Sequence, residues 1–254
     1  AEQSGIGVPV LRFYSFERIR AVTHQMDFFL PEDATFLHCR MRVVNDSQRE
    51  TGMYWWSNIA VPSNEKARNV VPADGAYTPI EGGVGIVPIP VRNGIDVTYP
   101  TNNPIAIDYF YKTYQNHRYY TSHIDENGYG LVQTSTSRLK GRKLFVWGQG
   151  QGGRHWGEWL SEEGQSYVEI QAGLAHTQLE HILHPDVQTR AAHGMALRAA
   201  APCGLPAAQR VEQLLPQKAV QRHTGALFHR AAQQIKRRIG IGVFRLCVRR
   251  QRIG

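Results

Sequence analysis

The sequence is poor in the features that mark disulfide frameworks, zinc sites and membrane spans. It has three cysteines, Cys39, Cys203 and Cys247, an odd number without metal-type spacing. This set predicts neither a disulfide framework nor a zinc site and favours a reducing compartment, so we expect a cytoplasmic protein. No run of 18 apolar residues occurs, so we expect no transmembrane helix. The first four residues have no basic start and no apolar core, so we expect no signal peptide.

Before residue 175 the sequence also lacks a 3.6-residue apolar repeat sustained over ten residues. Instead, short apolar stretches with period-two alternation recur between Gly, Pro, Asn and Asp. Many short strands at regular spacing are typical of a sandwich or barrel, so we predict an all-β fold, an antiparallel β-sandwich. The expected strands are 8–14, 18–30, 36–44, 53–61, 69–72, 84–91, 95–99, 107–112, 118–122, 130–135, 143–148 and 166–172.

Charge divides the chain into two compositions. Residues 1–180 hold 16 Lys and Arg against 19 Asp and Glu, a net charge of −3, whereas residues 181–254 hold 13 against 2, a net charge of +11. All five tryptophans and all eleven tyrosines lie in the first part. We therefore predict a β-sandwich domain over residues 1–181 and a basic, Ala- and Arg-rich tail over residues 182–254.

The stretch 166–178 is the most informative for function. Its alternation predicts a half-buried strand with Tyr167, Glu169 and Gln171 on one face and small apolar residues on the other. A carboxylate and an amide two residues apart lie about 6–7 Å from each other along a strand. Beside a tyrosine, they would suit the floor of a site for a polyhydroxyl ligand, although a solvated strand face carries the same pattern.

Tryptophan is abundant for a domain of this size. Flat indoles with a hydrogen-bond donor at the rim suit sugar rings, which are apolar on their C–H faces and polar at their edges. Core packing explains any single tryptophan equally well, but we expect at least one of the group to contact a ligand. The group comprises Trp55, Trp56, Trp147, Trp156 and Trp159.

The glycine-rich run 148–153 resembles a phosphate-binding loop only superficially. No Lys-Ser or Lys-Thr pair follows it, and no helix at βαβ spacing is predicted after it. We therefore predict a flexible loop that leads into the polar and aromatic run 154–159, which would form the rim of a site.

Asp108 lies among aromatic residues within an apolar strand. Because a buried, unpaired carboxylate is costly, Asp108 should be paired, exposed at an edge or functional. The histidines show no spacing typical of metal ligands, so we expect neither a metal nor a cofactor.

Several long stretches resemble a bacterial domain of unknown function, number 5107. The resemblance covers about residues 8–181, and the stretches that carry it are 17–20, 25–31, 53–62, 71–74, 94–100, 128–136, 141–148 and 169–178. That family is similar to the galactose-mutarotase-like β-supersandwich, and its members are often joined to tetratricopeptide repeats, which are absent from this sequence. The resemblance implies that fold and a carbohydrate ligand.

The resemblance to mutarotases also implies roles for single residues. Glu169 would correspond to the catalytic base of a Glu-Thr-Gln strand motif, here Glu-Ile-Gln, and Asp108 to a ligand-binding aspartate. Tyr54 falls where mutarotases carry a histidine, and tyrosine is the poorer general acid near neutral pH. Family members have a longer N-terminal part, so we expect a partial, N-terminally incomplete domain with impaired activity.

The tail after residue 181 has no counterpart in the family. Helices are expected at 207–215 and 224–239, and basic clusters occur at 236–238 and 249–250. The abrupt change in composition favours translation of GC-rich DNA in a shifted frame. A solvated basic tail and a nucleic-acid binder are the alternatives, and the lack of interleaved aromatics argues against the second.

Two functions remain open from the sequence. The first is a carbohydrate-active enzyme, similar to an aldose epimerase or a glycoside hydrolase, with Glu169 as base and Asp108 as ligand or partner carboxylate. The second is a non-catalytic carbohydrate-binding module. Either way the expected partner is a carbohydrate, with neither a membrane nor a nucleic acid bound. The expected sugar contacts are Tyr54, Trp55, Trp56, Asn58, Trp147, Arg154, Trp156 and Gln171.

Overall fold

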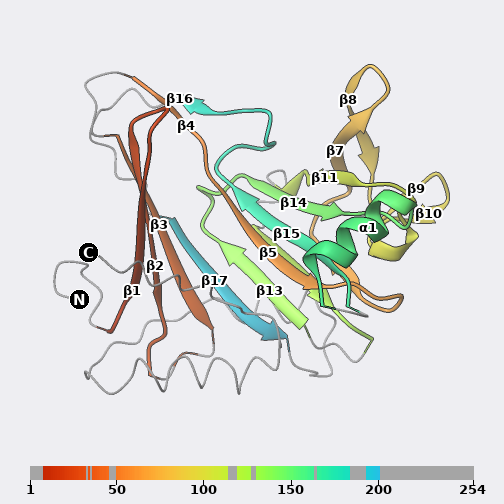
Figure 1. Ribbon diagram of the computed structural model, residues 1–254, viewed down its shortest axis with the longest axis horizontal. Coiled ribbons are helices and arrows are strands. Elements are labelled where there is room, and N and C mark those ends of the chain that lie inside the picture. Colours follow the sequence, from red (N-terminus) through yellow and green to blue (C-terminus); the bar gives the residue numbers. More distant parts are fainter. Residues whose placement is uncertain are drawn as a thin grey trace.

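The fold is built from two large antiparallel sheets, as the computed structural model shows (Figure 1). The structure describes residues 8–32, 34, 36–45, 50–113, 119–126, 130–162, 165–183 and, for the backbone alone, 193–200. The all-β prediction is confirmed, since among these residues strands dominate and α1 (Gln151–Leu160) is the one α-helix.

The first sheet has seven strands in the order β1-β2-β3-β17-β13-β12-β6. All of its neighbouring pairs are antiparallel. Its strands are β1 (Leu11–Glu17), β2 (Val22–Phe29), β3 (Leu37–Asn45), β17 (His193–Ala200), β13 (Gly130–Ser135), β12 (Tyr120–Ile124) and β6 (Arg68–Val70).

The second sheet has six strands in the order β5-β15-β14-β11-β7-β8. They are β5 (Trp56–Pro62), β15 (Tyr167–Gly173), β14 (Gly141–Val146), β11 (Ile107–Tyr111), β7 (Gly75–Ile80) and β8 (Gly83–Pro88). Two short pairs complete the described strands, β9 (Val91–Arg92) with β10 (Ile95–Asp96) and β4 (Gly52–Met53) with β16 (Ile182–Leu183), and η2 (Pro100–Asn102) is a 3₁₀ turn.

The main core lies between the two sheets. The seven-stranded sheet contributes Cys39 and Leu131, and alternate residues of the six-stranded sheet, such as Ile59, Leu144 and Ile170, pack against them. The sandwich follows from the period-two pattern, because every second side chain of β5, β14 and β15 is turned inward, and all of these except Ser57 and Arg142 are apolar. The other face of the six-stranded sheet is thereby left to carry polar and aromatic side chains.

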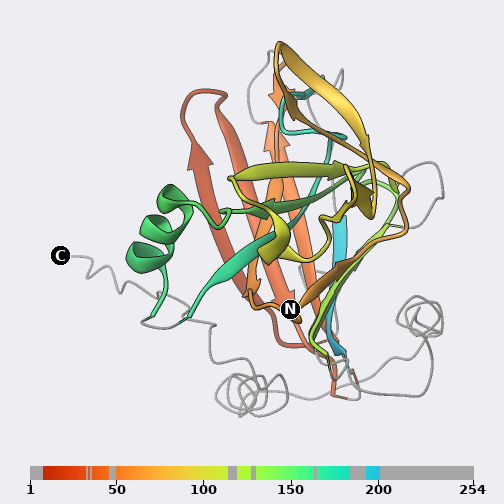
Figure 2. The same ribbon diagram turned by 90° about the vertical axis from the view of Figure 1, so that its right-hand side faces the viewer.

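The connection between β14 and β15 differs from the sequence-based expectation. We predicted a flexible loop after Gly148, but residues 151–160 form helix α1. Its apolar positions Trp156, Trp159 and Leu160 are at helical spacing, but they fill only the last turn and are all exposed. The three glycines in α1 also argued against a helix, because glycine has low helix propensity. Figure 2 shows α1 beside the end of the sheet where β14 ends and β15 begins.

The seven-stranded sheet extends past the predicted domain boundary at residue 181. β17 follows that boundary in sequence, yet its backbone pairs with β3 on one side and β13 on the other. The helices expected at 207–215 and 224–239 lie outside the described residues, so the division of the chain stays a prediction. No helix in the described ranges is long and apolar enough to cross a membrane.

Candidate functional site

A continuous line of polar side chains crosses the outer face of the six-stranded sheet. We call it the polar row; its members are Asn58, Glu169, Gln171, Gln178, Lys143 and Asp108. Four adjacent strands, β5, β15, β14 and β11, supply all of them except Gln178, which lies beyond the end of β15. The sequence predicted four of the six members, and the register of the strands brings them together.

The first half of the polar row is centred on Glu169. Gln171 lies directly opposite Asn58 on β5 and opposite Lys143 on β14. Glu169 Oε2 accepts hydrogen bonds from Asn58 Nδ2 at 2.7 Å and from Gln171 Nε2 at 2.9 Å. Glu169 Oε1 accepts no hydrogen bond from the described part of the chain. The carboxylate is therefore oriented through one oxygen and open at the other.

The second half of the polar row is centred on Lys143. Gln171 Oε1 accepts a hydrogen bond from Gln178 Nε2 at 2.7 Å, and Gln178 Oε1 accepts one from Lys143 Nζ at 2.6 Å. The same ammonium lies 2.6 Å from Asp108 Oδ1. With 6% of its side chain exposed, Lys143 is a nearly buried cation whose charge is balanced by Asp108. This pairing meets the expectation that a carboxylate among aromatics needs a partner.

Lys143 and Gln178 were missed by the sequence analysis. Lys143 also lies over the rings of Phe110 and Phe145, 5.3 and 5.4 Å from their centroids. The available signal was the alternation Lys143, Phe145, Trp147 along the strand, which places a lysine on the same face as two aromatic residues. Gln178 lies past the end of β15, where period-two alternation no longer predicts which way a side chain points.

Trp56 forms a flat end to the polar row because two glycines make room for it. A Cβ on Gly173 would come within 2.1 Å of the indole, and one on Gly141 within 2.3 Å. Gly173 pairs with Trp56 on one side and with Gly141 on the other, so the ring lies across both neighbouring strands. Its edge meets the ring of Phe110 at a centroid distance of 5.8 Å.

A group of aromatic rings connects the polar row to α1. Trp147 packs edge-to-face on Phe145 at 4.6 Å and on Tyr167 at 5.9 Å between ring centroids, and it stacks on Trp156 at 6.0 Å. Burial raises the pKa of the Tyr167 phenol, and the charge of Glu169 raises it further. Tyr167 thus stays a neutral hydroxyl at the edge of the site.

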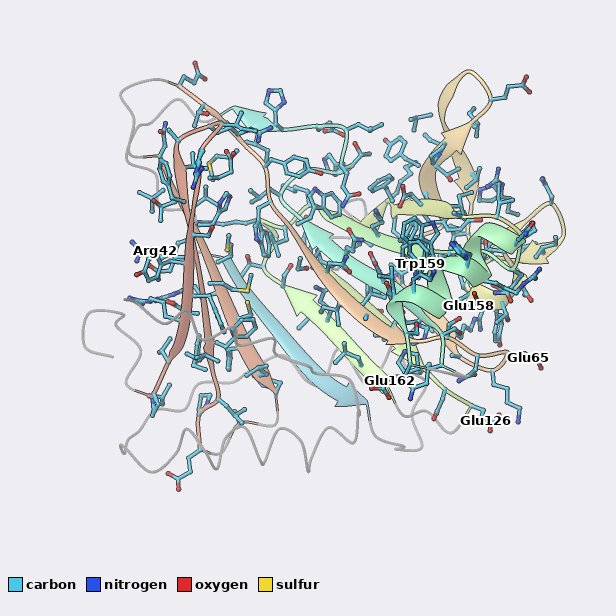
Figure 3. All side chains as sticks on the ribbon, viewed as in Figure 1. Arg42, Glu65, Glu126, Glu158, Trp159 and Glu162 are labelled. Carbon is cyan, nitrogen blue, oxygen red and sulfur yellow. The ribbon has the colours of Figure 1, made fainter. Side chains whose placement is uncertain are left out.

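A cavity of about 430 Å³ lies under α1. It is next to the polar row, because Trp147 and Tyr167 are among its walls. From the α1 region Arg154, Glu158 and Glu162 also line it. Figure 3 shows Glu158 and Trp159 on α1 and Glu162 just beyond it. The run 154–159, predicted to form the rim of a site, lies in this helix and contributes Arg154 and Glu158 to the cavity wall.

Two predicted sugar contacts, Trp55 and Tyr54, lie neither in the polar row nor among the aromatic rings and cavity residues beside it. Trp55 is only 8% exposed and packs in a second core cluster with Met41 and Leu174, so the expectation that it faces a ligand beside Trp56 is wrong. Trp55 precedes β5, which begins at Trp56, and its side chain packs in the core while that of Trp56 lies on the outer face against Phe110. Tyr54 precedes β5 and is 38% exposed. The charge that acts on its phenol comes from Arg20, in the turn between β1 and β2, and not from a member of the polar row.

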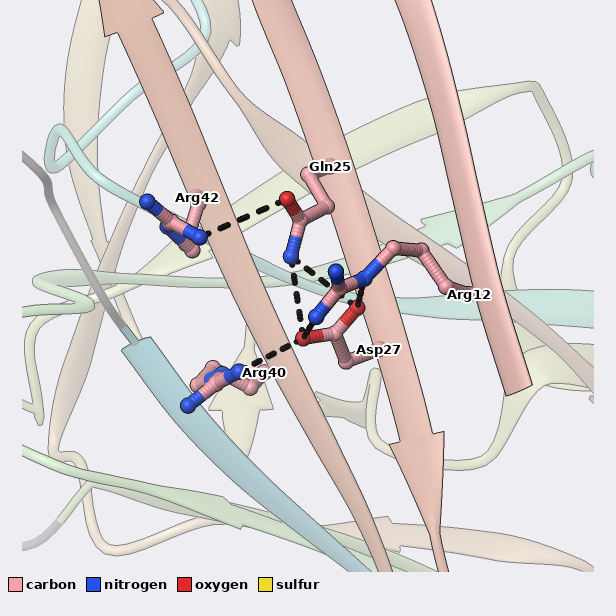
Figure 4. Close-up of polar contacts among 5 residues, drawn as sticks. All are labelled: Arg12, Gln25, Asp27, Arg40 and Arg42. Carbon is pink, nitrogen blue, oxygen red and sulfur yellow. Dashed lines mark hydrogen bonds and ion pairs between the residues drawn. The ribbon is translucent and has the colours of Figure 1, made fainter. Parts of the chain in front are cut away.

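A second charged cluster lies on β1, β2 and β3 of the seven-stranded sheet (Figure 4). The side chain of Asp27 is fully buried, and its carboxylate accepts hydrogen bonds from Arg12, Arg40 and Gln25. Two arginines thus balance the charge of the buried carboxylate and join β1 and β3 to β2. No group of three or more His, Cys, Asp or Glu side chains in the described ranges is arranged to hold a metal ion.

Comparison with known families and structures identifies a family and a shared fold. The family model described as Domain of unknown function (DUF5107) matches residues 15–193, past the point at which the resemblance seen in the sequence ends. A TPR-domain-containing protein from Parabacteroides distasonis superposes with a TM-score of 0.62 at 17% identity, over 85% of this chain and 38% of that protein.

Two further solved structures share the fold at lower identity. A putative aldose 1-epimerase from Escherichia coli K12 gives a TM-score of 0.55 at 11% identity, over 75% of this chain and 64% of that one. A protein from Synechocystis gives 0.53 at 10%, over 77% and 63%. The chain thus spans less than two thirds of each of these proteins. At such identities the likeness shows the fold alone, an antiparallel β-sandwich that this chain shares with those proteins.

Proposed function

Since the chain belongs to the family described as Domain of unknown function (DUF5107), we propose that its domain binds a neutral carbohydrate on the polar row and acts at the anomeric centre. The observation that carries the proposal is the polar row itself. Two carboxylates, three amides and one ammonium lie along it, and the indole of Trp56 and the ring of Phe145 flank it. Sugar recognition needs this combination of hydrogen-bond partners for hydroxyl groups and flat apolar surfaces for C–H faces.

Glu169 is the proposed general base. Its Oε2 is held by Asn58 and Gln171, which fixes the orientation of the carboxylate before any ligand arrives. The open Oε1 would take the proton of the anomeric hydroxyl, which begins ring opening or displacement at that carbon. Preorganisation of this kind contributes to catalysis because the base needs no rearrangement on the way to the transition state.

Asp108 is proposed as a ligand of sugar hydroxyls. Its Oδ1 is occupied by the ammonium of Lys143, so proton donation from Asp108 would require breaking that pair. Glu169, Phe145 and Asp108 stand in one cross-strand row, so the two carboxylates share a face with one strand between them. This shared face favours an enzyme over a binding module, because chemistry at one sugar ring needs both groups on the same side.

The alternative is a non-catalytic carbohydrate-binding module, and a specific observation favours it. No histidine belongs to the polar row, and the tyrosine expected in its place, Tyr54, lies near Arg20 instead. A second proton donor of suitable pKa is the part that an epimerase needs and a binding module does not.

The two candidates separate when binding and turnover are measured on the same substitution. We expect neutral hexoses to bind this chain in titration calorimetry, and Gln171→Leu to abolish binding because it breaks the polar row. Glu169→Gln should change affinity less than about 3-fold, and in a longer member of the family it should lower the rate of anomer interconversion, followed by polarimetry, at least 1000-fold, about 4 kcal/mol.

The control is Glu126→Gln, which removes an exposed carboxylate paired with Lys66 on the other sheet and should alter neither quantity. Unchanged turnover in Glu169→Gln would refute Glu169 as the base, whereas binding without any turnover in the unaltered protein would leave only the binding module. No binding of any neutral hexose would refute both candidates.

A further inference from the structure

We propose that the cavity under α1 is a second sugar subsite, so that the ligand of the polar row is a neutral oligosaccharide or glycoside and not a free monosaccharide. This inference rests on the proposed function of the polar row and adds to it the length and the charge class of the ligand. It assigns a use to Trp147, to Arg154 and to Gly157, the residue of α1 that leaves space open toward the cavity.

The first argument is the size and chemistry of the cavity. Its volume of about 430 Å³ falls within the range of small-molecule sites. An indole and a phenol, Trp147 and Tyr167, form part of the wall, and the amides of Gln149 and Gln165 and the hydroxyl of Ser166 supply donors and acceptors. These groups repeat the composition of the polar row, with flat rings beside neutral hydrogen-bonding groups.

The second argument is continuity with the polar row. Tyr167 lies two residues before Glu169 on the same face of β15, a step of about 7 Å. On the neighbouring strand, Phe145 contacts both Lys143 and Trp147. The cavity therefore begins one sugar-sized step beyond the proposed base, along the direction of the strands. A ligand whose anomeric carbon is at Glu169 would extend its next unit over Tyr167 toward α1.

The third argument is charge, which selects neutral ligands. Arg154 is the one cation among the residues that line the cavity, and its guanidinium donates to the carbonyl oxygen of Gln149. The carboxylates of Glu158 and Glu162 line the same cavity, so two negative charges face the one positive charge of Arg154. Glu169, two residues after Tyr167 on β15, adds a third carboxylate nearby. A uronic acid or a sugar phosphate would meet repulsion here, whereas a neutral unit would meet only hydrogen-bond partners.

The fourth argument is the open space that glycine leaves on α1. Gly157 lines the cavity, and a Cβ built on it meets no atom within 4 Å. Gly152 is also helical and also open, but it does not line the cavity. A larger side chain at position 157 would fill the subsite, and the same side chain at position 152 would point elsewhere. The chain thus offers a matched pair of variants.

The experiment is calorimetric titration of the whole chain with two saccharide series. One series is glucose, maltose and maltotriose, and the other is galactose and the disaccharide of two β-1,4-linked galactose units. We expect at least one disaccharide to bind 10-fold or more tightly than its monosaccharide. Gly157→Leu should remove this gain while monosaccharide affinity stays within 2-fold, and Gly152→Leu should keep the gain. Circular dichroism of both variants checks that the fold is intact.

The outcomes separate the subsite from the proposed function. Monosaccharide binding without any gain for disaccharides overturns the subsite and leaves the polar row as the site. A gain that survives Gly157→Leu, or a loss shared by Gly152→Leu, also overturns it. Equal affinity for an acidic disaccharide, a disaccharide with one uronic acid unit, refutes the neutral class. If neither series binds, the proposed function fails together with the inference.

Discussion

Asp27 is a carboxylate that the fold removes from water and surrounds with donors (Figure 4). Arg12 approaches both oxygens, at 2.7 and 3.0 Å, and Arg40 lies 2.7 Å from Oδ2. Burial by itself pushes the pKa of Asp27 upward, but the hydrogen bonds and charges of the two arginines outweigh it and lower the pKa to about 2. The network joins β1, β2 and β3 through their side chains.

Asp27 should make the free energy of unfolding depend on pH. Its pKa is lower in the folded chain than the ordinary value of about 4, so its contribution is full above pH 4 and disappears as the pH falls toward 2. Asp27→Asn should lower the free energy of unfolding by about 2 kcal/mol at pH 7 and by much less at pH 2.5. Urea unfolding at both pH values measures this. An exposed pair offers the control: Glu126→Gln, beside Lys66, should cost less than about 0.5 kcal/mol. An equal loss at both pH values would contradict the ionic origin.

At the residue scale, alternation predicted much of the site. It placed Glu169 and Gln171 on one face, and strand pairing then brought Asn58 beside them. It could not predict Lys143, because a lysine in a strand is ordinarily solvated and only the neighbouring strands reveal that this one is buried. The prediction for Trp55 was wrong because this residue precedes β5 and packs in the second core cluster, whereas Trp56 begins the strand and lies on the outer face.

At the scale of the element, the placement of Trp56 at the start of β5 depends on Gly173 and Gly141 in the neighbouring strands. Gly173→Ala would drive a methyl group into the indole of Trp56, which rests against Phe110 and cannot move freely. We expect a loss of about 1–3 kcal/mol in urea unfolding and a fall of at least 10-fold in hexose affinity. Gly152→Ala in α1 is the matched glycine control, since its Cβ meets nothing, and it should stabilise the chain by up to about 1 kcal/mol. A Gly173→Ala protein with unchanged hexose affinity would separate Trp56 from the site.

Which elements could be predicted follows from how they are stabilised. β5 has one buried and one open face along its length, β15 begins in the same way, and the sequence records this as alternation. α1 has no buried residue and contains three glycines, so neither an apolar repeat nor helix propensity predicted it. β7 was not predicted either, because its polar and proline residues, Thr78 and Pro79, interrupt the alternation.

At the scale of the whole molecule, β17 decides whether the seven-stranded sheet is continuous. Its backbone pairs with β3 from His193 to Leu197 and with β13 from Met195 to Ala200. Composition placed the boundary of the domain at residue 181, because charge and aromatic content change there. Backbone hydrogen bonds do not depend on composition, which is why a strand from the basic part can complete a sheet built by the first part.

Two shortened chains test this role of β17. A chain ending at residue 183 lacks the strand, so β3 and β13 each lose a partner and the sheet divides into β1-β2-β3 and β13-β12-β6. A chain ending at residue 200 keeps it. We expect the shorter chain to unfold at a lower urea concentration and to associate as its concentration rises, because two open strand edges are exposed to other molecules. Sedimentation velocity and urea unfolding of both chains measure these effects. Equal midpoints and equal monomer content would support the boundary at residue 181 instead, with β17 contributing nothing to the sandwich.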